Sequence, residues 1–117
     1  MNRVTHFEIP AGDPQAVMDF FSKTFGWKFT EFIPGIYWSA ETGENDAPGI
    51  NGGLMKRRDP QQPIVNAIHV ADIDAAMDNV KANGGTIVVE KMEIPSGSWL
   101  AYFKDPDGNI HGLWQKE

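Results

Sequence analysis

The chain contains the same residue pattern twice, and this internal repeat restricts its fold more than any other feature. The motif I-P-x-x-x-W-x-A occurs at residues 33–40 and again at residues 94–101, so Trp38 matches Trp99. Further pairs recur at nearly the same spacing: Asp13 with Asp72, Gly26 with Gly85, and Gly53-Leu54 with Gly112-Leu113. A solenoid needs at least three stacked units, so two copies in 117 residues indicate one domain made of two similar halves.

Each half is expected to fold as a strand, a helix and three more strands. Phe7 and Ile9 alternate with His6 and Glu8, so the two pairs should point to opposite faces of a strand. Asp13 precedes Pro14 as a helix N-cap, and Asp72 has the same role in the second half. The expected strands cover residues 4–9, 28–32, 37–41 and 52–57, then 64–70, 86–91, 99–104 and 110–115.

Each helix carries an apolar stripe at helical spacing. In the first half the stripe is Val17, Phe20, Phe21 and Phe25, which we expect in the core. In the second half it is Ile73, Ala76, Met77 and Val80. The predicted fold class is therefore α+β, with two β-α-β-β-β modules at about residues 3–57 and 64–115. The polar, proline-containing stretch 58–63 should link them, within one domain covering residues 1–117.

Composition excludes several classes of protein. With 41% hydrophobic residues the chain is too apolar to be disordered, yet no apolar run is long enough to span a membrane. The net charge of -6 argues against a nucleic-acid partner, because the one basic cluster, Lys56-Arg57-Arg58, is short. The absence of cysteine excludes disulfides and thiolate chemistry. The N-terminal residues lack the apolar core of a signal peptide, so we expect a soluble cytoplasmic protein.

Two modules of this kind, together with two short motifs, make the chain similar to the vicinal oxygen chelate superfamily. The motifs are Asn83-Gly84-Gly85 at a helix end and the turn Asp105-Pro106-Asp107-Gly108-Asn109 before the last strand. This superfamily includes glyoxalase I, extradiol dioxygenases and the bleomycin- and fosfomycin-resistance proteins. The resemblance covers residues 3–115 and implies curved mixed sheets around a shared cavity, with the helices outside.

The resemblance also implies a divalent metal held by side chains on the first and last strand of each module. The first-strand position falls on His6, and the repeat places its counterpart at Val65. The last-strand positions fall at or near Gly53 and Gly112. Only His6 can coordinate a metal, so we predict neither a metal site nor another cofactor. A divalent metal is the alternative, if the chain is an enzyme.

Other residues complete the expected cavity. His69 shares strand parity with Val65, and Trp114 shares parity with Gly112, so both could face the cavity. Met55 stands beside Gly53, and the open space walled by apolar side chains suits a planar or aromatic ligand. The predicted ligand-binding residues are His6, Glu8, His69, Trp114 and Met55. His111 has the opposite parity and is expected on the helix side.

These residues support two hypotheses about function. The first is a small-molecule binding protein of the bleomycin-resistance type, with a degenerate metal site. The second is a glyoxalase- or dioxygenase-related enzyme with an altered active site, in which His6 and Glu8 are the candidate catalytic residues. A partner-binding domain without chemistry is a third reading. By family analogy and aromatic content we expect a homodimer that binds a small molecule but neither nucleic acid nor membrane.

Overall fold

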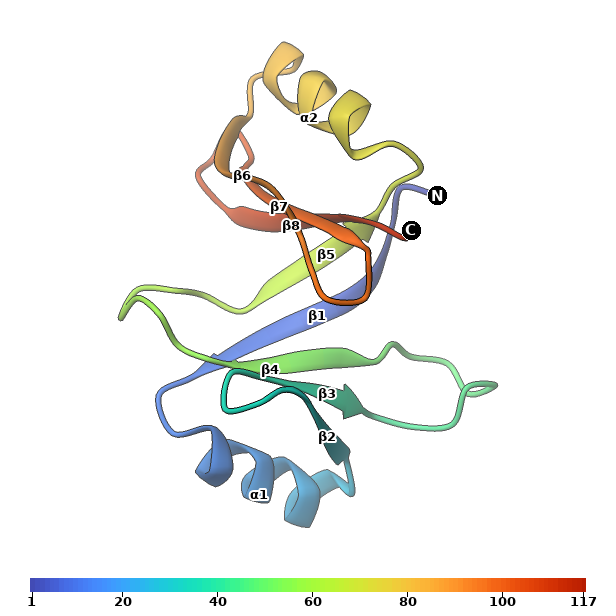
Figure 1. Cartoon of the computed structure of the whole chain (residues 1–117), viewed down its shortest axis with the longest axis vertical. Helices are drawn as coiled ribbons and strands as arrows, with labels where there is room; N and C mark the ends of the chain where they lie inside the picture. Colours follow the sequence, from blue (N-terminus) through green and yellow to red (C-terminus); the bar gives the residue numbers. More distant parts are fainter. The chain divides into compact units, whose positions relative to one another are not determined.

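The computed structural model describes all 117 residues, which form eight strands and two helices (Figure 1). They divide into two compact units: His6–Ile64, and Met1–Thr5 together with Val65–Glu117. The elements of the first module are β1 (Arg3–Ala11), α1 (Pro14–Phe25), β2 (Lys28–Ile33), β3 (Tyr37–Glu41) and β4 (Gly52–Lys56). Those of the second are β5 (Val65–His69), α2 (Ile73–Ala82), β6 (Thr86–Glu93), β7 (Trp99–Lys104) and β8 (Ile110–Gln115). The α+β class and the β-α-β-β-β order of both modules are confirmed.

The two modules have the same strand arrangement. The order is β2-β3-β4-β1 in the first and β6-β7-β8-β5 in the second. In each, the first strand pairs in parallel with the last, and the other neighbours are antiparallel. A parallel pair needs a long crossover connection, and each helix forms part of it. None of the helices is long and apolar enough to cross a membrane.

Helix α1 begins and ends where its sequence signals indicate. The Asp13 carboxylate accepts a hydrogen bond from the Ala16 backbone N–H at 3.1 Å, and proline occupies the first turn. The helix stops at Gly26, whose positive φ of 75° is the left-handed conformation that glycine adopts without strain. The Asp72 carboxylate caps α2 in the same way, through the Ala75 N–H at 3.1 Å.

The core of the first module differs from the predicted one. Its buried residues are Ala11, Met18 and Leu54, against which Val17, Phe29 and Trp38 pack. Two of the three phenylalanines that we expected in this core lie outside it. Phe20 is 56% exposed and Phe25 is 62% exposed, because α1 presents only a narrow stripe around Met18 to β4. The prediction for both was therefore wrong, whereas Phe21 is half-buried and stacks on Trp27 with ring centroids 4.5 Å apart.

The core of the second module follows its predicted helix stripe. Ile73 and Met77 are buried together with strand residues, and Ala76 and Val80 pack against them. Helix α2 lies against β6, β7 and β8, as Figure 1 shows. The spacing of apolar residues therefore predicted the buried face of this helix correctly.

Strand register tests the residue pairs of the repeat. Glu8 lies opposite Gly53 in the first module, and Ala67 lies opposite Gly112 in the second, so Gly53 and Gly112 are structural counterparts. The match of Trp38 with Trp99 is wrong. Trp38 lies opposite Leu54, and the counterpart of Leu54 is Leu113, which lies opposite Ala101. Trp99 is thus two residues, or one side-chain repeat, away from the equivalent position.

Candidate functional site

Three of the predicted site residues lie on one face of the first module's sheet, the face that α1 does not cover. His6 and Glu8 are two apart on β1, and Glu8 lies opposite Gly53 of β4. Met55, two residues beyond Gly53, is on the same face. The next strand adds Tyr37 to this face, since Tyr37 lies opposite Met55 in the β3–β4 ladder. We call His6, Glu8, Tyr37, Gly53 and Met55 the site face.

A hydrogen bond between two ionisable side chains lies at the centre of the site face. The His6 Nε2 atom is 2.8 Å from the Tyr37 hydroxyl oxygen. The bond has two arrangements: the hydroxyl donates to Nε2, or a protonated Nε2 donates to the hydroxyl. The residues are 31 positions apart in the chain, and only the β1–β4–β3 pairing brings them together. Sequence reasoning identified His6 but missed Tyr37.

Gly53 gives the tyrosine the space that it needs. A Cβ atom at position 53 would overlap the Tyr37 hydroxyl group. No side chain therefore fits at position 53 while Tyr37 keeps its hydrogen bond to His6. The space that a metal-ligating side chain at position 53 of β4 would occupy is thus filled by the Tyr37 hydroxyl group from β3.

The surroundings keep both partners of this hydrogen bond uncharged near neutral pH. Burial lowers the pKa of His6 below its usual 6.5, because the interior disfavours the charged imidazolium. Burial also raises the pKa of Tyr37, and the negative charge of Glu8 raises it further.

The Glu8 side chain is only 4% exposed, so its carboxyl group is shielded from bulk water. A buried charge is tolerated only when other groups interact with it, and Glu8 has such interactions. No buried side-chain nitrogen or oxygen in the chain lacks a hydrogen-bond partner. On the site face, the sulfur of Met55 accepts a hydrogen bond from the Gln62 side-chain amide at 3.4 Å.

The other two predicted cavity residues, His69 and Trp114, lie together in the second module. They are opposite each other in the β5–β8 ladder, and their rings stack with centroids 4.2 Å apart and 15° between the planes. The Trp114 indole N–H donates to the Thr5 hydroxyl at 3.0 Å. This arrangement gives a half-buried aromatic surface on which the indole N–H is already hydrogen-bonded. A cavity shared by the two modules stays a prediction.

His111 has a structural role on the other face of β8. Its ring stacks on Phe103, and its Nε2 atom lies 2.9 Å from an Asp105 carboxylate oxygen. Asp105 also accepts backbone hydrogen bonds from Asp107 and Asn109, so this carboxylate organises the turn before β8. The hydrogen bonds from His111 and Asn109 hold the pKa of Asp105 well below its usual range. The expectation that His111 belongs to the helix side is confirmed.

The donors required for a catalytic divalent metal do not come together. Such a site needs about three or four nitrogen or oxygen ligands, and no group of three His, Asp or Glu side chains is suitably placed. At the expected positions, His6 is engaged by Tyr37, and Gly53 has no room for a side chain. Val65 and Gly112 offer no donor atom. The residues of this chain therefore do not fit the metal that the resemblance implies.

Comparison with known proteins identifies the family. The model of the Glyoxalase/Bleomycin resistance protein/Dioxygenase superfamily matches residues 3–111. The chain belongs to this superfamily. A glyoxylase-like domain-containing protein of Didymella fabae is 28% identical over 117 residues, covering 95% of this chain and 91% of the relative. The protein CFP32 of Mycobacterium bovis is 27% identical over 92% of this chain, which spans only 43% of that longer protein.

Several solved structures share the fold of this chain. A variant of the Streptomyces coelicolor methylmalonyl-CoA epimerase, in complex with 2-nitronate-propionyl-CoA, has a TM-score of 0.74. It is 18% identical, and the match covers 99% of this chain and 95% of the epimerase. The epimerase from Mycobacterium tuberculosis has a TM-score of 0.70 at 16% identity, over 97% of this chain and 87% of that one. At this identity the likeness concerns the fold alone.

Proposed function

We propose that this superfamily member is a small-molecule binding protein whose site face works without a divalent metal. The observation that supports the proposal most strongly is the position of Tyr37. Its hydroxyl engages His6 and fills the space beside Gly53, which are two of the positions where the family resemblance implies metal ligands. A hydrogen-bonded pair of neutral side chains thus replaces a cation at this place. The same pair offers a donor and an acceptor to a bound molecule.

The chemistry of the site face suggests the kind of ligand. His6 and Tyr37 are neutral, Glu8 is a buried acid, and Met55 supplies a polarisable apolar surface. Such a surface suits an uncharged, planar or apolar molecule that carries one or two hydrogen-bonding groups.

The experiment is a screen of aromatic fragments by two-dimensional NMR, followed by calorimetric titration of the hits. Ligands should shift the signals of residues on the site face. His6→Ala and Tyr37→Phe should each weaken binding about tenfold, which corresponds to about 1.4 kcal/mol. Glu44→Gln, in the exposed loop of residues 42–51, is the control and should bind normally. Full affinity in both His6→Ala and Tyr37→Phe would exclude the site face as the binding site.

A second candidate function is an enzyme that uses His6 as a general base. The lowered pKa of His6 favours this reading, because a base must be unprotonated at working pH. If Nε2–H donates to Tyr37, the His6 Nδ1 lone pair is free to take a proton from a carbon next to a carbonyl. The electron pair left on that carbon would move to the carbonyl oxygen, and the proton would return from His6 to the carbon to complete the exchange.

Deuterium exchange distinguishes the enzyme from the binding protein. The substrate to test first is methylmalonyl-CoA. A solved structure with the same fold is a methylmalonyl-CoA epimerase in complex with this compound. Incorporation of solvent deuterium at its C2 carbon, lost in His6→Ala, would favour the enzyme. The tautomer of His6 gives a second readout, since the base requires a protonated Nε2 and nitrogen NMR reports it. Binding without exchange would favour the binding protein.

The expected homodimer is also a proposal. The chain mass is 13.0 kDa, and two exposed phenylalanines, Phe20 and Phe25, project from α1. Exposed aromatic side chains are enriched at interfaces between proteins. Light scattering at micromolar concentration should give twice the chain mass. A mass of one chain would contradict the dimer.

A further inference from the structure

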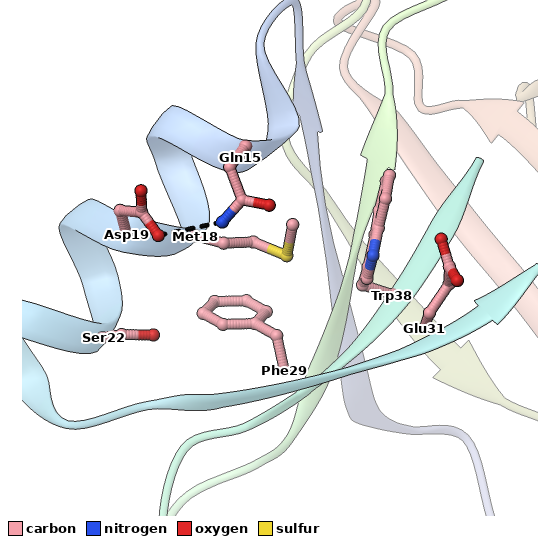
Figure 2. Close-up of a pocket in the computed structure, with 7 residues that line it drawn as sticks. All are labelled: Gln15, Met18, Asp19, Ser22, Phe29, Glu31 and Trp38. Atoms are coloured by element: carbon pink, nitrogen blue, oxygen red, sulfur yellow. Dashed lines mark hydrogen bonds between the residues drawn. The ribbon is translucent and has the colours of Figure 1, made fainter. Parts of the chain in front are cut away.

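A hollow of about 390 Å³ opens between α1 and the strands β2 and β3 of the first module (Figure 2). It lies on the α1 side of the sheet, because Trp38 lines it and the adjacent Tyr37 points to the opposite face. Its volume falls in the range of small-molecule pockets, roughly 300–1,000 Å³. This hollow is separate from the site face and is not used by the proposed function.

The floor of the hollow is apolar and aromatic. Met18 is buried in the core, and the rings of Phe29 and Trp38 are half-buried against it. Figure 2 shows the Met18 thioether between the Phe29 ring and the Trp38 ring. Because the core holds these side chains in place, the floor is formed before any ligand arrives. Polar side chains provide most of the surface that solvent reaches in the hollow, so the floor offers a ligand a small apolar contact patch.

The rim of the hollow is acidic. Asp19 comes from α1, and Glu31 comes from β2, where it lies opposite Trp38. Asp19 accepts one hydrogen bond from Gln15 at 2.9 Å, and Glu31 accepts one from the Gly35 backbone N–H at 3.0 Å. A carboxylate has about four acceptor sites, so both retain acceptor capacity. No lysine, arginine or histidine lines the hollow to balance these two charges.

We infer that this hollow binds a small organic cation, an amine or quaternary ammonium with an apolar body. The faces of aromatic rings carry negative charge and attract cations, and Trp38 and Phe29 provide two such rings. Asp19 and Glu31 add direct attraction from two elements, and the net charge of -6 raises the local concentration of cations. The acidic rim opposes the binding of anions for the same reason.

The test is an NMR titration of the full chain with benzyltrimethylammonium, compared with the neutral benzyl alcohol. The cation should shift signals of α1, β2 and β3, including the Trp38 indole N–H, and should leave the His6 ring signal unchanged. Because the two carboxylates are exposed, salt screens them, and about tenfold more salt should weaken binding at least about threefold. Equal binding of the neutral alcohol would overturn the inference, and so would the absence of saturable shifts.

One double variant without the two rim charges tests the rim. The double variant Asp19→Asn and Glu31→Gln retains acceptors for Gln15 and for the Gly35 N–H, so it should fold normally. It should weaken binding of the cation about fivefold or more, whereas the control Glu44→Gln removes one exposed charge elsewhere and should change binding less than about twofold. Unchanged affinity in the double variant would refute the role of the rim. His6→Ala leaves this hollow untouched, so its effect on site-face ligands is measured independently.

Discussion

The hydroxyl of Tyr37 lies where a side chain at position 53 would have to begin. Any Cβ atom on Gly53 would overlap it, and the same hydroxyl is 2.8 Å from His6 Nε2. The sequence keeps a histidine at one expected ligand position, His6, and has a glycine at another, Gly53. Both residues contact the same Tyr37 hydroxyl group. The glycine is required by the tyrosine, and the tyrosine engages the histidine.

Replacing Gly53 with alanine should destabilise the chain. The new methyl group forces Tyr37 out of its place, and such overpacking of a well-packed region costs about 1–3 kcal/mol. The free energy of unfolding, measured by urea denaturation, should fall by this amount. Gly43→Ala is the matched control, because a Cβ there meets no atom within 4 Å.

Removing the tyrosine side chain should relieve the penalty at position 53. In a Tyr37→Ala background, Gly53→Ala should cost much less, since the overlapping group is gone. A double-mutant cycle measures this coupling, which we expect to be about 1 kcal/mol or more. Additive effects of the two substitutions would contradict the contact.

Stability should depend on pH through His6. The pKa of His6 is lowered in the folded chain, so the unfolded chain binds this proton more readily. The stability that neutral His6 contributes is complete above the unfolded pKa of about 6.5 and is lost as pH falls through the folded pKa. An NMR titration of the His6 ring should give a midpoint below 6.5. A midpoint at or above this value would show that burial does not control the ring.

The two kinds of apolar residue on the first module should respond differently to truncation. Leu54 is fully buried, so Leu54→Ala should lower the free energy of unfolding by about 2–5 kcal/mol. Phe20 is 56% exposed, so Phe20→Ser should cost less than about 1 kcal/mol. Thermal and urea unfolding of both variants checks the ranking. Equal losses would indicate that Phe20 is buried after all, for example in an assembly.

Local signals in the sequence predicted the architecture because each acts over a few residues. Asp13 and Asp72 cap their helices through contacts three residues away, and the alternation along β1 placed His6 and Glu8 on one face. Contacts across strands could not be predicted in this way. Tyr37 reaches His6 only through the register of β3 on β4 and of β4 on β1.

Aligning the two halves by identical residues gave a wrong counterpart for Trp38. The two I-P-x-x-x-W-x-A motifs align Trp38 with Trp99, but strand pairing makes Ala101 the counterpart of Trp38. Turns of different length precede the two strands, and a shift of two residues keeps every side chain on its original face. The face of each residue was therefore predicted more reliably than its partner.

The last prediction concerns metal. His6 is the sole donor at the four positions that the family resemblance implies, and its Nε2 atom is already bonded to the Tyr37 hydroxyl. One imidazole cannot hold a catalytic ion against water, since stable sites use about three or four ligands. Protein purified without chelator should contain well under about one divalent ion per chain. Added zinc or manganese should raise the melting temperature of the unsubstituted chain by no more than it raises that of His6→Ala.

Tyr37→Phe frees Nε2 and is the sharper comparison. If the hydroxyl competes with a metal, this variant should gain affinity for zinc. Stoichiometric metal in the unsubstituted chain, lost in His6→Ala, would disprove the metal-free site and favour the enzyme over the binding protein.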